Sequence, residues 1–178
     1  MKKVVVISSS PRKNSNSLIL SKEFAHGASE SGHSVEFINL SDYNISYCIG
    51  CYACHKSGQC FKNDGMNELG KKLVEADVIC FSTHVYFYSM SGQLKVFIDR
   101  LVPYYEKVRA DIYMIATMWD SESSMMENTF EAIRGLTRDC FERCEEKGVL
   151  FASGLDGEGE ASSRSDYMLA AYNMGKNC

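Results

Sequence analysis

The sequence has no excess of basic residues and no long apolar run. Among 178 residues, 19 Lys and Arg stand against 23 Asp and Glu, which gives a formal net charge of −4. A chain without excess positive charge lacks the electrostatic footprint of a nucleic-acid-binding protein. The apolar run near its start, residues 4–7, is too short for a signal-peptide core or a membrane span. We therefore expect a cytoplasmic protein that binds neither nucleic acid nor membrane.

Proline and low-complexity segments are also scarce. Only two prolines occur, 45% of the residues are apolar and 24% are charged, which is the composition of an ordinary globular protein. A chain of this length is the size of one domain and buries roughly 70% of the surface that its unfolded form exposes. Because neither a repeat nor a linker interrupts it, we expect residues 1–178 to form a single domain.

Five short runs rich in β-branched residues recur along the chain, and most segments between them carry an apolar period of 3.6 residues. The runs are residues 4–7, 35–38, 78–81, 112–116 and 149–152. This alternation predicts an α/β fold in which helices cover a five-stranded parallel sheet. Because the first helix directly follows the first strand, we expect a flavodoxin-like, doubly wound, three-layer sandwich of strand order 2-1-3-4-5.

Four of the eight cysteines lie outside the cysteine-rich segment described below. The apolar period that includes Phe130 and Ile133 extends to Cys140 and Cys144, so we expect these two thiols on a buried helical stripe. Cys80, within the third strand, is also expected in the core. A short final helix, residues 167–174, is predicted after the acidic, glycine-containing segment 155–161.

Two loops at the carboxyl ends of the first and third strands are the expected ligand site. In this strand order the connections after those strands leave in opposite directions and open a crevice between them. The loops are residues 8–17 and 84–91.

The first loop, SSSPRKNSNS, has no glycine. Neither the GxxxxGK[ST] pattern of ATPases nor the GxGxxG pattern of dinucleotide folds is present. The loop instead offers polar donors in front of a helix N-terminus, which suit a terminal monophosphate. Each charge-assisted hydrogen bond to such a group contributes roughly 1.5 to 3 kcal/mol. The alternative is that these residues only form the turn and cap the helix. The predicted phosphate ligands are Ser8, Ser10, Arg12, Ser15, Asn16 and Ser17.

The second loop contains three consecutive aromatic residues, which are poor turn formers but suit a flat wall for a planar ring. Its predicted ring-binding residues are Val85, Tyr86, Phe87, Tyr88, Ser89 and Met90. The alternative is an aromatic cluster that packs the loop or forms a subunit interface. His84 is expected at the rim, and Trp119, after the fourth strand, is a candidate for the outer edge of the ring or for the core. A phosphate site beside an aromatic wall fits flavin mononucleotide (FMN), and no side chain is assigned as an acid or base.

Four cysteines crowd between positions 48 and 60. Clustered thiols in a chain without an export signal indicate metal or redox chemistry rather than disulfides. Cys48, Cys51, Cys54 and Cys60 have the spacing C-x2-C-x2-C-x5-C, which is similar to the compact runs of ferredoxins, whereas zinc sites more often split into two pairs. Both a [4Fe-4S] cluster and free, reversibly oxidised thiols remain open. His55, between them, is expected to be a solvated loop residue.

The sequence resembles the NAD(P)H-dependent FMN reductase and iron-sulfur flavoprotein branch of the flavodoxin-like superfamily. Three segments carry the resemblance over nearly the whole chain: SSSPRKNSNS, CIGCYACHKSGQCFKNDGM and THVYFYSMSGQLKVFIDR. They resemble that family's phosphate, cysteine and isoalloxazine loops. The chain departs from the family at Ser8 or Ser9, where glycine is usual, at His84, where proline is usual, and at Gly65, where a second acid is usual.

The resemblance implies an FMN-dependent oxidoreductase that passes hydride from NAD(P)H through the flavin to a small-molecule electron acceptor, such as a quinone or free flavin. Relatives of this kind pair as homodimers or homotetramers. Two alternatives stay open. One is an iron-sulfur flavoprotein that transfers single electrons between a [4Fe-4S] cluster, FMN and a ferredoxin-like partner, and the other is a non-enzymatic flavin-binding redox sensor.

Overall fold

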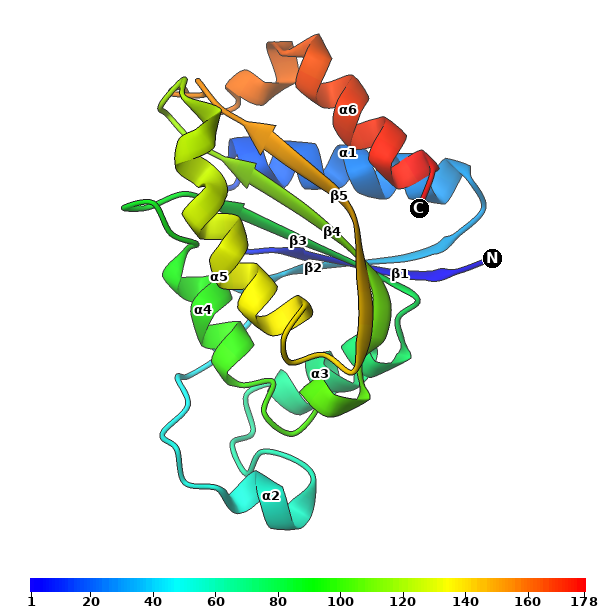
Figure 1. Ribbon diagram of the computed structural model, residues 1–178, viewed down its shortest axis with the longest axis vertical. Coiled ribbons are helices and arrows are strands. Elements are labelled where there is room, and N and C mark those ends of the chain that lie inside the picture. The colour runs from blue at the N-terminus through cyan, green and yellow to red at the C-terminus, as the bar shows by residue number, and fades with distance from the viewer.

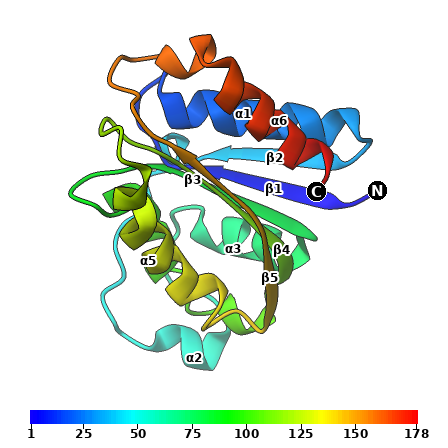
Figure 2. The same ribbon diagram turned by 45° about the horizontal axis from the view of Figure 1, so that its top comes forward.

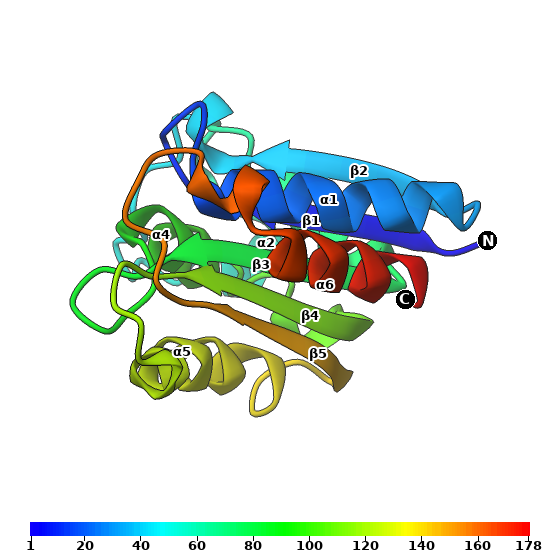
Figure 3. The ribbon, with the colours of Figure 1, turned by 90° about the horizontal axis from the view of Figure 1, so that it is seen from above.

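The computed structural model describes residues 1–178, and its single sheet has the predicted strand order. Five parallel strands run in the order β2-β1-β3-β4-β5, as Figure 3 shows from above. β1 and β3 are apolar and buried almost throughout because helices cover both faces of the sheet. The strands are β1 (Lys3–Ser8), β2 (Ser34–Asn39), β3 (Val78–His84), β4 (Arg109–Thr117) and β5 (Arg143–Ala152).

Helices form a layer on each face of the sheet, which confirms the predicted doubly wound sandwich. α1 (Asn16–Glu30) and α6 (Ser165–Lys176) lie together on one face, whereas α3 (Met66–Glu75), α4 (Gly92–Asp99) and α5 (Glu127–Thr137) cover the other (Figures 1 and 2). Each layer has its own apolar core. Phe24 of α1 packs in the first core, and Phe81, Phe97 and Phe130 pack in the second.

Serine side chains fix the two loops that leave β1 and β3. Ser15 caps α1 by accepting the Leu18 N–H at 3.2 Å, and Ser91 caps α4 by accepting the Leu94 N–H at 3.2 Å. The Ser91 hydroxyl also donates to Ser9 Oγ at 2.9 Å, and Ser9 donates to the Ser82 carbonyl at 2.9 Å. The carboxyl ends of β1 and β3 are therefore joined by buried hydrogen bonds.

The structure corrects the prediction for Cys140 and Cys144. α5 ends at Thr137, and the chain then turns so that Phe141 enters the apolar core. Cys140 consequently lies exposed in the turn, and Cys144 is a half-buried residue of β5, opposite Ala110 of β4. Cys80 is buried as expected. The final helix, α6, is present and extends beyond residues 167–174 at both ends.

The segment between β2 and α3 leaves the sandwich. It contains the short helix α2 (Ala53–Ser57), which projects away from the sheet in Figure 1. No helix in the structure combines the length and the apolar character that crossing a membrane requires.

Candidate functional site

A pocket lies at the carboxyl edge of the sheet, at the position expected from the strand order. Loops after β1, β3, β4 and β5 form its walls. It brings together Ser10, Arg12, Ser15, Asn16, Val85, Tyr86 and Trp119 from the predicted cofactor ligands, and it adds His84, Leu155, Asp156 and Glu158. The predicted phosphate loop and aromatic loop therefore face one cavity.

The phosphate loop has polar groups that no protein atom satisfies. The hydroxyls of Ser8 and Ser17 are fully buried and have no hydrogen-bond partner. Arg12 is exposed, forms no ion pair and lines the pocket. Ser10 accepts the Arg12 N–H at 3.3 Å, and its own O–H remains free to donate. Ser8 and Ser17 do not line the pocket, so the donors that face it from this loop are Ser10 and Arg12, and these fit a phosphate group.

Asn16 joins the phosphate loop to the acidic segment 155–161. Its Nδ2 donates to the Gly157 carbonyl at 2.9 Å, and its Oδ1 accepts the Ala161 N–H at 2.9 Å. The side chain thus holds the loop after β5 against the start of α1. A contact between Asn16 and phosphate stays a prediction.

The aromatic loop is a tight hairpin rather than a flat wall. Tyr86 and Ser89 exchange two backbone hydrogen bonds of 3.0 Å, and Phe87 and Tyr88 at the tip have φ angles of 48° and 59°. This left-handed turn is strained for aromatic residues. It directs Phe87, which is 98% exposed, into solvent, while Met90 is buried in the core. In this structure Val85 and Tyr86 line the pocket, whereas Phe87, Tyr88, Ser89 and Met90 do not.

His84 lies between the pocket and the hairpin. Its ring meets the Tyr86 ring edge-on at 4.5 Å, and neither ring nitrogen has a hydrogen-bond partner. Burial, with a smaller contribution from the Arg12 charge, lowers the pKa of His84, so the imidazole is neutral at pH 7. Trp119 follows the end of β4, is 69% exposed and lines the pocket, so it does not belong to the core.

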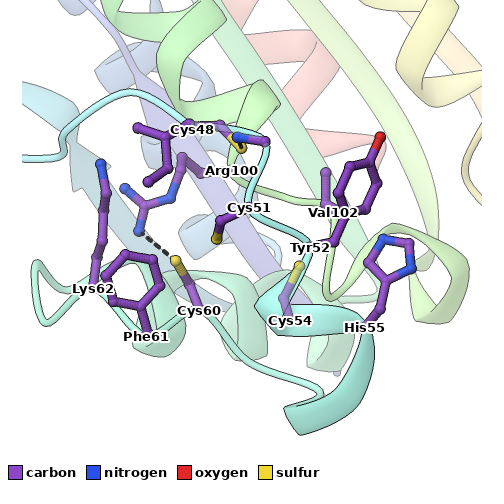
Figure 4. Close-up of a pocket in the computed structure, with 12 residues that line it drawn as sticks. Cys48, Cys51, Tyr52, Cys54, His55, Cys60, Phe61, Lys62, Arg100 and Val102 are labelled. Carbon is purple, nitrogen blue, oxygen red and sulfur yellow. Dashed lines mark hydrogen bonds between the residues drawn. The ribbon is translucent and has the colours of Figure 1, made fainter.

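The four clustered cysteines line a second pocket. All four are free thiols, and α2 carries Cys54. In Figure 4 they surround one cavity together with Tyr52, Phe61 and Val102. Left-handed conformations at Tyr52, Gly50 and Gly58 turn the loop around this space.

The cysteine pocket has four thiols as potential metal or cluster ligands. No three His, Cys, Asp or Glu side chains lie close enough to hold one metal ion. A [4Fe-4S] cluster is held by four cysteine thiolates, which are spread around it. Four thiols around one largely apolar cavity are the donor set that such a cluster requires.

A buried ion pair supports this cysteine loop from the side of α4. Arg100 is 2% exposed and binds Asp64 with two hydrogen bonds, of 2.7 and 3.0 Å. Burial opposes the charge on Asp64, but hydrogen bonds from Arg100 and Ser46 outweigh it and lower the pKa of Asp64 to about 2. The Arg100 guanidinium also reaches Cys60 Sγ at 3.2 Å. Sequence reasoning did not identify Arg100, because α4 also carries the exposed charges Lys95 and Asp99 and no local pattern distinguishes Arg100 from them.

Residues 2–131 match the sequence model of the family described as NADPH-dependent FMN reductase. The chain belongs to this family. Its fold is similar to that of solved structures. An azoreductase from Bacillus anthracis aligns with a TM-score of 0.76 and 13% identity over 100% of both chains. An NAD(P)H:quinone oxidoreductase from Methanothermobacter marburgensis aligns with a TM-score of 0.74 and 18% identity, over 99% of this chain and 96% of the other.

Curated members that are more similar in sequence are iron-sulfur flavoproteins. One from Methanocaldococcus jannaschii is 42% identical over 101 residues, which is 57% of this chain and 52% of that protein. One from Archaeoglobus fulgidus is 36% identical over 102 residues, 57% of this chain and 46% of that protein. The alignments span about half the length of these relatives.

Proposed function

We propose that this member of the FMN reductase family is an iron-sulfur flavoprotein. In this proposal FMN binds at the carboxyl edge of the sheet, a [4Fe-4S] cluster binds at Cys48, Cys51, Cys54 and Cys60, and electrons pass between them and an external partner. The observation that carries the proposal is the convergence of four free cysteines on one pocket, in a chain with a separate phosphate-binding loop. The names of the curated relatives support it.

The protein's own residues have binding and shielding roles. Arg12 and Ser10 would hold the FMN phosphate, because both line the pocket, Arg12 has no ion pair and the Ser10 O–H is free to donate. Contacts of Ser8 and Ser17 with the phosphate stay predictions. Val85, Tyr86 and Trp119 would contact the ring. When bound, FMN supplies hydride and single-electron chemistry, and the cluster supplies single-electron chemistry.

Purification without oxygen tests the proposal directly. We expect bound FMN and equal amounts of iron and sulfide, about four of each per chain. Cys51→Ser should lose most of the iron, whereas Cys140→Ser, which removes an exposed thiol outside the pocket, should retain it. Flavin-containing protein that lacks iron would contradict the cluster.

A second candidate is an NAD(P)H-dependent reductase that uses the flavin without a cluster. Membership of the NADPH-dependent FMN reductase family favours it. Rapid mixing of the FMN-loaded protein with NADPH or NADH, without oxygen, distinguishes the two functions. Flavin bleaching in iron-free protein, faster than free FMN is reduced, supports this candidate, and an acceptor such as a quinone should then restore the flavin absorbance. Absence of such bleaching with both nucleotides contradicts it.

A further inference from the structure

Arg100 closes one side of the cysteine pocket. It follows α4 directly, and its side chain is almost completely buried. Its Nη2 donates a hydrogen bond to Cys60 Sγ at 3.2 Å, which Figure 4 shows as a dashed line. Among the four cysteines of the pocket, Cys60 alone receives a hydrogen bond from a charged side chain.

The guanidinium is fixed by both ends of the cysteine loop. Nη1 donates to the Ser46 carbonyl, two residues before Cys48. Both terminal nitrogens bind the Asp64 carboxylate, four residues after Cys60. A bidentate pair of this kind sets the direction of the second Nη2 N–H, which points to the sulfur, while the buried Nε–H has no protein partner.

The backbone of Cys60 is also fixed by hydrogen bonds. The Asn67 side chain accepts the Cys60 N–H at 2.8 Å and donates to the Cys60 carbonyl at 2.7 Å. The Tyr104 hydroxyl donates to Asn67 Oδ1 at 2.8 Å. α3 and the segment after α4 therefore hold Cys60 in place, and the Arg100–sulfur contact is part of an ordered network.

We propose that Arg100 is a positioning residue that raises the reduction potential of the cluster through its hydrogen bond to the Cys60 thiolate. The proposal rests on the proposed function, because it requires a cluster in this pocket. Reduction adds one electron and breaks no bond, and a positive charge and an N–H donor at a ligand sulfur stabilise the added negative charge. Asp64 partly cancels the charge of Arg100, so the two residues act on the potential in opposite directions.

Substitutions of the two residues test this opposition. In Arg100→Gln we expect the ratio of reduced to oxidised cluster, at the wild-type midpoint potential, to fall about tenfold, which corresponds to about 59 mV for one electron. Asp64→Asn keeps an acceptor for the guanidinium but removes the negative charge, so the same ratio should rise. Arg100→Lys keeps the charge and should lie between the wild type and Arg100→Gln.

Lys62→Gln is the matched control. Lys62 lines the same pocket, but its amino group bonds Ser46 Oγ at 3.0 Å and the Tyr47 carbonyl at 2.7 Å, not a sulfur. We expect a shift of less than about threefold in the reduced-to-oxidised ratio, because its charge is partly screened by solvent. The readout is a redox titration followed by electron paramagnetic resonance, after iron and sulfide analysis of each protein.

The outcomes separate the two proposals. Wild-type protein without iron would overturn the proposed function and this inference with it. A loaded wild type with the same potential in Arg100→Gln would overturn the inference alone. If Arg100→Gln does not assemble a cluster, the reduction potentials of Asp64→Asn and Arg100→Lys test the inference instead. A raised potential in Asp64→Asn supports the inference, and an unchanged or lowered one indicates a purely structural ion pair.

Discussion

The pocket at the carboxyl edge of the sheet, where we propose that FMN binds, is lined by one cation and two carboxylates. Arg12 has no ion-pair partner, and Asp156 and Glu158 lie on the opposite loop, after β5. A phosphate dianion that entered this pocket would be attracted by Arg12 and repelled by Asp156 and Glu158. The affinity for FMN should therefore depend strongly on Arg12.

Arg12→Ala should weaken FMN binding about tenfold or more, because a charge-assisted hydrogen bond contributes roughly 1.5 to 3 kcal/mol. Quenching of FMN fluorescence by the apoprotein measures the dissociation constant. Riboflavin is the matched ligand, because it lacks the phosphate, and its affinity should be unchanged. An equal loss for both ligands would place Arg12 at the ring and not at the phosphate.

Ionisation of Tyr113 makes the free energy of unfolding depend on pH in the alkaline range. It is 6% exposed, and burial, aided by nearby Cys178 and Asp111, raises the pKa of Tyr113 to about 12. An unfolded tyrosine ionises near pH 10. Between these values the unfolded chain binds fewer protons than the folded one, so the free energy of unfolding falls as pH rises.

Tyr113→Phe should therefore lose less stability than the wild type between pH 9 and pH 11, by roughly 1 kcal/mol. The phenol forms no hydrogen bond to the protein, so the substitution removes little else. Urea unfolding followed by circular dichroism at both pH values measures the difference. Parallel losses in the two proteins would show that another group controls the alkaline transition.

For individual residues, the sequence predicted which loops form the pocket better than it predicted the directions of their side chains. Ser10, Arg12 and Ser15 line the pocket, as their place between a strand and a helix predicted, although Ser15 also caps α1 and contact with a phosphate stays a prediction. The direction of Phe87 was not predictable, since it depends on the left-handed hairpin formed by Tyr86 and Ser89. Burial of Met90 depends in the same way on the path of the loop.

At the scale of elements, α1 and α6 pack in backbone contact. A Cβ atom added at Gly175 of α6 would overlap the Phe24 carbonyl of α1, and one added at Gly27 of α1 would overlap the Tyr172 carbonyl of α6. Neither obstacle can rotate away, because both are main-chain atoms. The two glycines set the distance between the helices.

Gly175→Ala should consequently destabilise the protein by about 1 to 3 kcal/mol, the usual cost of overpacking. Gly135→Ala in α5 is the matched control, because nothing lies within 4 Å of its added Cβ. The control should be neutral or stabilising by up to about 1 kcal/mol, since alanine favours helix. Urea unfolding of both variants tests this, and equal effects would contradict the close packing of α1 and α6.

Element boundaries were the weaker part of the sequence prediction. The helical period continues in phase to Cys140 and Cys144, but the helix ends at Thr137, where the chain turns to bury Phe141. Periodicity reports which residues share a face of an existing helix, and it does not report where tertiary packing ends that helix. All five strands were predictable as elements because each contains a short apolar run, but β5 starts at Arg143, six residues before the predicted run 149–152, with charged residues that carry no such signal.

For the whole molecule, the strand order predicted the fold and the presence of a pocket at the carboxyl edge of the sheet. For the cysteine pocket, the sequence predicted the four thiols but not the residues that support them. Spacing identified its four thiols, but the contacts of Arg100 with Asp64 and Cys60 join residues that are 36 and 40 positions apart. Such contacts depend on how α3 and α4 pack beneath the loop, which no local pattern encodes.

Large apolar side chains remain exposed around both pockets. They are Tyr47, Ile49, Tyr52 and Phe61 on the cysteine loop, Tyr86 and Trp119 at the pocket on the carboxyl edge of the sheet, and Phe87 and Tyr88 at the tip of the aromatic hairpin beside it. Exposed apolar residues that gather in this way indicate an interaction surface. We propose that a second copy of the chain covers the aromatic hairpin, in a homodimer or homotetramer.

Phe87→Ser should then raise the dissociation constant of self-association at least about tenfold, because burial of a phenylalanine contributes about 1.5 to 3 kcal/mol. Leu169→Ser is the matched control, because Leu169 is 59% exposed on α6, away from the hairpin. Sedimentation equilibrium of the three proteins, each checked for folding by circular dichroism, gives the constants. A monomeric wild type, or equal weakening by both substitutions, would contradict the hairpin interface, since a contact centred on Phe87 cannot depend equally on a residue of α6.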